Sequence, residues 1–127
     1  MNLKRTTNYS LLIAATLLFS NCSSAANDAN ENSDCDVNEN LSYTKDILPI
    51  LEENCLSCHN EENYSKKADG RLFEGYDNFK KYIDKGTVVK AINHETGLVK
   101  MPYRKAKLDD CTILKIETWV EEGSKNN

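Results

Sequence analysis

The chain has 127 residues, of which 39% are apolar and 28% are charged. This length and composition fit one small globular domain with polar segments attached. Five glycines and two prolines exclude collagen-like and proline-rich repeats, and 16 basic against 20 acidic side chains give a net charge of −4. Proteins that bind nucleic acids carry a basic excess, so the charge argues against that class.

The first segment, residues 1–21, is typical of a secretory signal peptide. Lys4 and Arg5 precede an apolar run at Leu11–Phe19, which is too short to span a bilayer and has the length of a signal-peptide core. The run leads to Cys22, whose surroundings resemble a bacterial lipobox. We therefore predict export and lipidation of Cys22, with ordinary cleavage nearby as the alternative.

Residues 22–40 hold almost no apolar side chains, so they cannot bury enough surface to offset the entropy of ordering. They predict a flexible tether between the lipid and a domain at 41–127. Loss of residues 1–21 removes two basic side chains and no acid, which leaves 14 basic and 20 acidic side chains and a net charge of −6. We expect the domain on the periplasmic side of a bacterial membrane or on the cell surface. A domain of about 85 residues has a marginal core and usually needs a staple or a cofactor.

The domain shows helical periodicity. Asp46 is suited to cap a first helix with Pro49 in its first turn, and the spacing of apolar residues places Cys55 and Cys58 on the buried face. Further helices are expected at Tyr76–Lys85, at Val88–Ile92, and from Asp109 or Asp110 to about Glu122. Only residues 71–73 offer a strand candidate, and it is weak. The fold class predicted is therefore all-α.

Residues 55–59 have the form C-x-x-C-H, the attachment motif of c-type haem. Thiols three positions apart on a helical turn can add to the two haem vinyl groups, and the following imidazole of His59 can ligate the iron. The alternatives are a thioredoxin-like dithiol, which would need a βαβ pattern, and half a zinc site. A zinc site would need further paired ligands, whereas the remaining candidates stand alone in the sequence: Cys35, His94 and Cys111.

A sixth iron ligand is expected from Met101, which lies 42 residues after His59. Its thioether is a soft ligand that raises the reduction potential, and Pro102 stiffens the backbone around it. A lone methionine is otherwise core filler, but the polar neighbours of Met101 argue against that role. His94 is the competing ligand, although we expect it on an exposed turn at residues 93–97.

Two further cysteines remain when Cys22 is assigned to lipid. In an oxidising compartment an even pair predicts a disulfide, here between Cys35 and Cys111. Such a bridge would contribute about 3–4 kcal/mol in the chain-entropy model and would tie the end of the tether to the last helix. Free thiols or an intermolecular bridge are the alternative.

A first helix ending in C-x-x-C-H, middle helices, a Met-Pro loop and a last helix with an aromatic resemble a class I cytochrome c. Residues 41–125 are similar to the small monohaem cytochrome c domains of exported Bacteroidetes lipoproteins, although Tyr103 stands where those domains often have proline or glycine. The resemblance implies one covalent haem c, thioethers at Cys55 and Cys58, His59 as proximal ligand and Met101 as distal ligand. It also implies that the first and last helices pack together, with Trp119 near the haem.

The function expected is single-electron transfer by a monomer, with transient redox protein partners and no enzymatic reaction. With both axial positions filled, the iron would have no open site for oxygen or peroxide. Basic residues near Met101 could steer an acidic partner, or they could form an ordinary solvated loop; they are Lys100, Arg104, Lys105 and Lys107. The alternative functions are a small-ligand or peroxide-reactive haem protein with a labile sixth ligand, an accessory haem subunit of a larger oxidoreductase, and a lipoprotein whose haem only staples the fold.

Overall fold

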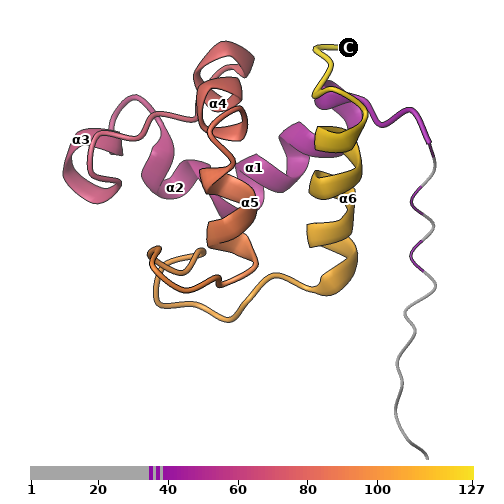
Figure 1. Ribbon diagram of the computed structural model, residues 1–127. Helices are drawn as coiled ribbons and strands as arrows, with labels where there is room; N and C mark the ends of the chain where they lie inside the picture. The colour runs from indigo at the N-terminus through magenta and orange to yellow at the C-terminus, as the bar shows by residue number, and fades with distance from the viewer. Residues whose placement is uncertain (1–34, 36, 38) are drawn as a thin grey trace, which may run out of the picture. The chain divides into compact units, whose positions relative to one another are not determined.

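The computed structural model describes residues 35, 37 and 39–127. The predicted signal peptide, Cys22 and most of the predicted tether lie outside these residues. All regular structure in the described part is helical, which confirms the all-α class, and none of its helices has the length and hydrophobicity to cross a bilayer. The helical elements are η1 Tyr43–Ile47, α1 Leu48–Asn54, α2 Leu56–His59, α3 Tyr64–Lys67, α4 Tyr76–Ile83, α5 Thr87–Ile92 and α6 Asp110–Glu121 (Figure 1).

The first helical run begins at Tyr43, three residues before the predicted cap, so the assignment of Asp46 as N-cap is wrong. Ser42 is the N-cap of η1, and its side chain accepts from the backbone N–H of Lys45. The Asp46 carboxylate instead reaches back and accepts from the backbone N–H of Ser42 at 2.7 Å. Each side chain thus accepts from a backbone N–H group that has no partner within the helix, as in a capping box. The π-type turn that begins here continues directly into α1.

The attachment motif spans the end of α1 and the whole of α2. Pro49 lies in the first turn of α1, where proline's fixed φ suits the helix. Cys55 departs from helical geometry, with φ −121°, yet the Cys55 N–H still donates to Leu51 and the His59 N–H to Cys55. The chain therefore continues in helical sense through the motif, and both thiols and the imidazole are carried on neighbouring turns.

The two helices predicted in the middle of the domain are present. Helix α4 ends shortly before Gly86, and α5 begins directly after it. This glycine has φ 66°, in the left-handed region that glycine adopts without steric cost. The short α3 was not predicted. It follows a turn in which the Asn60 side chain accepts from the Asn63 N–H at 2.9 Å. The weak strand candidate at 71–73 is wrong, since these residues form no strand.

The last helix, α6, begins at Asp110 because Asp109 is its N-cap. The Asp109 carboxylate accepts from the backbone N–H of Thr112 at 2.9 Å and from its hydroxyl at 2.6 Å. Cys111, in the first turn, forms the predicted disulfide with Cys35, with a Cα–Cα distance of 5.4 Å. This bridge fixes the N-terminal end of the described chain to α6.

The core lies where η1, α4, α5 and α6 meet. Trp119 of α6 is fully buried and stacks on Phe79 of α4, with ring centroids 6.0 Å apart, and it also contacts Tyr43 of η1. Figure 1 shows α6 at a steep angle to α1, and α6 packs against both η1 and α5. The expected packing of the first and last helices is therefore present, made through η1.

The residues after α6 tie the two ends of the domain together. The Glu122 carboxylate accepts from the backbone N–H groups of Asn40 and Leu41, at 2.6 and 2.9 Å. The Asn127 backbone carbonyl accepts from the Thr44 N–H and hydroxyl. These bonds and the disulfide hold the two ends of the domain together. The surroundings of the motif at 55–59 are formed instead by α2–α5 and the loop before α6.

Candidate cofactor site

A cavity of about 770 Å³ opens between the C-x-x-C-H motif, α5 and the loop that follows it. This volume is within the roughly 300–1,000 Å³ typical of small-molecule and cofactor sites. Both motif thiols, His59 and Met101 line it, together with apolar side chains from distant parts of the chain: Phe73, Val88, Ala91, Ile92, Leu98, Val99 and Leu108. The structure thus brings together the four predicted ligand and attachment residues.

The His59 side chain is 5% exposed and is held on two sides. Its Nδ1 lies 2.8 Å from the backbone carbonyl of Arg71, and its ring stacks on Phe73 with centroids 4.0 Å apart. A carbonyl oxygen only accepts, so Nδ1 carries the proton and donates. Burial lowers the pKa of the imidazole, which favours the neutral form. A neutral ring protonated at Nδ1 has its lone pair on Nε2, the arrangement that a metal-ligating histidine requires.

Sequence reasoning did not single out Arg71, whose carbonyl orients His59. The loop that carries Arg71 is fixed locally, because its N–H donates to Ala68 at 3.0 Å and its guanidinium pairs with Asp69 at 3.1 Å. The Phe73 N–H also donates to the His59 carbonyl at 2.8 Å. Every residue has a backbone carbonyl, so the amino-acid type at position 71 does not indicate this contact and only the three-dimensional structure reveals it.

Cys55 and Cys58 are free, half-buried thiols that face the same cavity. Burial raises the pKa of the Cys55 thiol to about 11, against a smaller opposing effect of Lys105. A redox-active dithiol requires a thiol pKa lowered toward neutrality, so this environment disfavours the thioredoxin-like alternative. In the described part of the chain, no group of three or more His, Cys, Asp or Glu side chains is placed to hold a metal ion.

Met101 is half-buried, and its backbone is attached to the end of α5. The Met101 N–H donates to the carbonyl of Ala91 at 3.0 Å. Residues 93–109 form no helix or strand, so this attachment fixes where the loop crosses the cavity. Met101 packs against the edge of the hydrophobic core, and its thioether also lines the cavity that holds the imidazole and the two thiols, where it could serve as a soft metal ligand.

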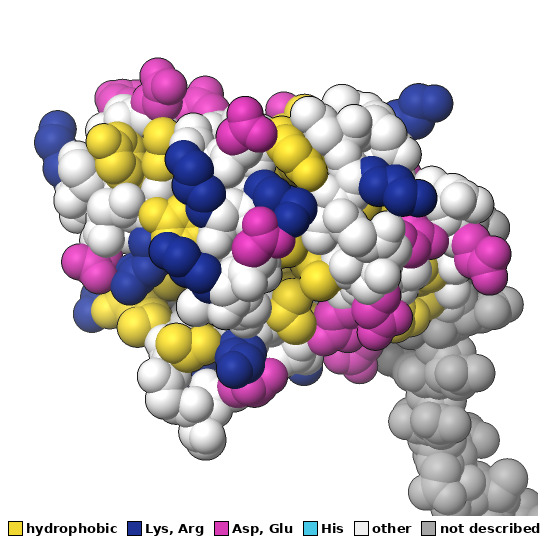
Figure 2. Space-filling model, turned by 45° about the horizontal axis from the view of Figure 1, so that its top comes forward, with side chains coloured by type: hydrophobic (Ala, Val, Ile, Leu, Met, Phe, Trp, Pro, Cys, Tyr) yellow, Lys and Arg dark blue, Asp and Glu magenta, His cyan; other side chains and the backbone are white. Residues whose placement is uncertain are grey.

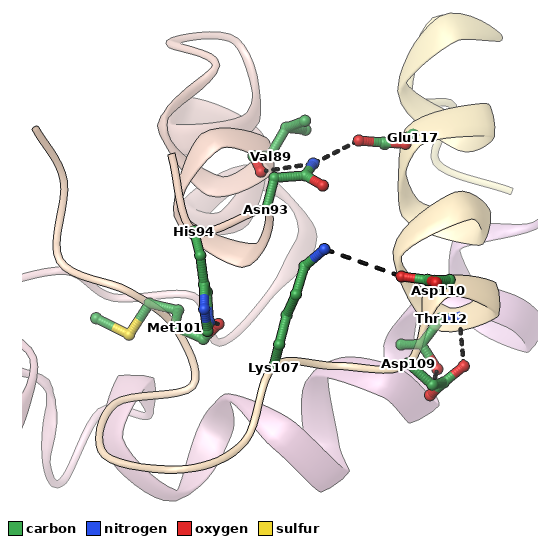
Figure 3. A network of polar contacts seen from close by, with 9 residues as sticks. All are labelled: Val89, Asn93, His94, Met101, Lys107, Asp109, Asp110, Thr112 and Glu117. Atoms are coloured by element: carbon green, nitrogen blue, oxygen red, sulfur yellow. Dashed lines mark hydrogen bonds and ion pairs between the residues drawn. The ribbon is translucent and has the colours of Figure 1, made fainter. Parts of the chain in front are cut away.

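The turn predicted at residues 93–97 is present and its last three residues are exposed, but His94 itself is less exposed than expected. Its side chain is half-buried, and its Nε2 lies 3.0 Å from the backbone carbonyl of Met101 (Figure 3). Because that carbonyl can only accept, Nε2 carries a proton and has no lone pair for a metal. His94 also does not line the cavity. The structure therefore separates the two candidate sixth ligands and places only Met101 in the cavity wall.

Positive charge is concentrated at the cavity. Four basic residues contribute to its lining, against a single acid, Asp69; they are Lys66, Lys67, Arg71 and Lys105. Figure 2 shows lysine and arginine side chains bordering exposed apolar patches on one face. Leu98, Val99 and Tyr103, which line the cavity, are exposed large hydrophobic residues. Of the cluster predicted near Met101, Lys107 instead pairs with Asp110 at 3.9 Å.

Trp119 does not line the cavity. It reaches His59 only through successive ring contacts, from Trp119 to Phe79, from Phe79 to Phe73, and from Phe73 to His59. The tryptophan therefore supports the wall behind His59 from within the core.

Comparison of this chain with protein-family models, curated proteins and solved structures finds no match. The arrangement of the cavity is thus the basis for a functional assignment. It presents two thiols, one oriented imidazole and one thioether around a mainly apolar space with a basic rim. Thiols could attach a cofactor covalently, and an imidazole and a thioether could ligate a metal that it carries.

Proposed function

We propose that this chain is a monohaem c-type cytochrome of the class I type, a single-electron carrier whose helical domain folds around one haem c. The observation that carries the proposal is the convergence of Cys55, Cys58, His59 and Met101 on one cavity, although Met101 lies 42 residues from the motif. The bound haem supplies the reversible one-electron chemistry.

The two thiols would hold the cofactor covalently. Cys55 and Cys58 would each form a thioether with a vinyl group of the haem, with the thiol hydrogen going to the neighbouring vinyl carbon and no oxidant needed. Covalent attachment also compensates for the small core, because a ligand that binds only the folded state stabilises it.

His59 and Met101 would be the axial ligands. The Arg71 carbonyl and the Phe73 ring keep the His59 lone pair on Nε2 and the ring plane fixed. The Met101 thioether is the ligand type that raises the reduction potential of a haem iron. With both His59 and Met101 bound to the iron, the domain would transfer electrons without binding a substrate at the metal. The mainly apolar lining of the cavity would give the haem a surrounding of low dielectric constant, which is one of the ways in which a protein adjusts a reduction potential.

Transient redox proteins are the proposed partners. The basic rim of the cavity stands out on a net acidic chain, so a partner with an acidic surface would be steered toward the cavity. We expect a monomer that docks through a small interface, below about 1,200 Å². Attachment to the periplasmic side of a bacterial membrane through a lipid on Cys22 completes the proposal and rests on the sequence.

Covalent haem attachment tests the proposal. The mature chain is produced together with a c-type maturation system, purified under denaturing conditions and weighed by mass spectrometry. We expect the mass of one haem on the wild-type chain and on a Ser57→Ala control, and none on a Cys55→Ser, Cys58→Ser variant. A wild-type chain that folds without added haem mass contradicts the proposal.

A further inference from the structure

Two hydrogen bonds hold the backbone of Met101, one to the last turn of α5 and one to a residue just after that helix. Its N–H donates to the Ala91 carbonyl at 3.0 Å, and its carbonyl accepts from Nε2 of His94 at 3.0 Å. Figure 3 shows the Met101 thioether directed away from the His94 ring. The imidazole thus contacts the backbone of the residue and leaves its side chain free to face the cavity.

The end of α5 is itself anchored. Asn93 donates from Nδ2 to the Val89 carbonyl at 3.1 Å and to the Glu117 carboxylate of α6 at 2.5 Å. His94 follows directly, with φ 59° in the left-handed region, where a non-glycine side chain is uncommon and strained. Glycine would relieve that strain but would supply no hydrogen-bond donor for Met101.

We infer that His94 is a positioning residue that keeps the Met101 thioether in the cavity and so controls how firmly the sixth coordination position is closed. The inference rests on the proposed function. Without the imidazole, Met101 would keep only its bond to Ala91, in the stretch 93–109 that has no helix or strand. Because Nε2 donates in both the neutral and the protonated ring, the role does not depend on the charge of His94.

The test measures how readily added imidazole displaces Met101 from the ferric iron of the mature holoprotein. His94→Gly and His94→Ala remove the donor, whereas His94→Gln offers an amide N–H at a similar reach. The donor-free variants should bind imidazole about 2- to 13-fold more tightly than wild type, the factor that one net hydrogen bond is worth. His94→Gln should stay near the wild-type value.

Two comparisons separate positioning from general stability. Thermal unfolding of His94→Gly should be unchanged or improved, since glycine tolerates the left-handed backbone, while its imidazole affinity still rises. Asn93→Ala should lower stability through its lost contact with α6 and should change imidazole affinity less than His94→Gly does. A merely structural role for His94 would move stability and affinity together.

The outcomes also distinguish this inference from the proposed function. A wild-type protein whose ferric spectrum lacks the sulfur-to-iron band shows that Met101 does not ligate the iron, which overturns the axial assignment and this inference with it. A wild-type protein with that band, together with His94→Gly and His94→Ala variants of unchanged imidazole affinity, overturns the positioning role alone.

Discussion

The Nδ1 atom of His59 lies 2.8 Å from the backbone carbonyl of Arg71, and this contact decides which nitrogen of the ring is available to a metal. It joins the C-x-x-C-H motif to the loop after α3, so the orientation of the proposed ligand depends on a segment outside the motif. The stacked Phe73 ring fixes the remaining rotation of the imidazole.

Loss of the Phe73 ring should therefore destabilise the domain and loosen His59. Phe73 is buried against His59, Phe79 and Tyr82, so Phe73→Ala should cost about 3–5 kcal/mol of unfolding free energy. Phe73→Leu keeps most of the volume and should cost clearly less. Chemical denaturation of the three proteins measures both values, and equal stability of Phe73→Ala and wild type would show that the ring does not support the site.

Met101→Ala should keep the covalent haem, lower the reduction potential and open the iron to carbon monoxide, because the soft thioether ligand is removed. Redox titration and the carbon monoxide difference spectrum of the reduced protein measure these effects. Leu114→Ala, exposed on α6 and outside the cavity lining, is the control and should resemble wild type. An unchanged potential in Met101→Ala would exclude the thioether as the ligand.

The disulfide should contribute about 4 kcal/mol to stability, because it closes a long loop between residues at separation 76. A Cys35→Ser, Cys111→Ser variant should lose this amount in urea unfolding while it keeps the visible spectrum of the site. Wild-type protein treated with a thiol reductant should match the double variant. If reduction and mutation leave the unfolding midpoint unchanged, the bridge does not stabilise the domain.

Asp109 should stabilise α6 only while its carboxylate is ionised. Hydrogen bonds from the Thr112 side chain and backbone lower the pKa of Asp109 in the folded state. A lowered folded pKa means that the unfolded chain binds the proton more readily, so this stabilisation is present above the ordinary aspartate pKa and is lost as pH falls through the lower folded value. Asp109→Ala should cost about 0.5–2 kcal/mol near pH 7, and the difference in melting temperature from wild type should shrink below about pH 4. A difference that does not vary with pH would point to a cause other than the carboxylate.

Lys105 should steer anionic redox reagents toward the cavity that it lines. Reversal of its charge in Lys105→Glu should slow oxidation of the reduced protein by ferricyanide at low salt and flatten the dependence of the rate on ionic strength. Lys45→Glu makes the same charge change on η1, away from the cavity, and should have a smaller effect. Equal slowing by both variants would indicate an effect of net charge alone.

The parts of the fold that the sequence predicted are those fixed by local signals. Gly86 marks the boundary of α4 and α5, and Asp109 caps α6, because both features act within one turn of the chain. The start of the first helix was misplaced because Asp46 reaches back to Ser42 rather than forward, a choice that local propensity does not determine.

In the candidate site, too, some features were predicted from the sequence and others were missed. The motif at 55–59 and Met101 carry their chemistry in residue type and spacing, so both were predicted, and the structure places them in one cavity. The supporting contacts were missed because they use backbone carbonyls, that of Arg71 for His59 and that of Met101 for His94. Any residue can supply a carbonyl, so only the folded chain shows which one does.

The visible absorption spectra of the oxidised and reduced mature domain, with and without carbon monoxide, test the central claim most directly. We predict a low-spin spectrum of covalently bound haem, with the weak sulfur-to-iron band in the oxidised form and no response of the reduced form to carbon monoxide. A high-spin spectrum, or a reduced form that binds carbon monoxide readily, would contradict an electron carrier ligated by His59 and Met101 and would favour a ligand-binding haem protein.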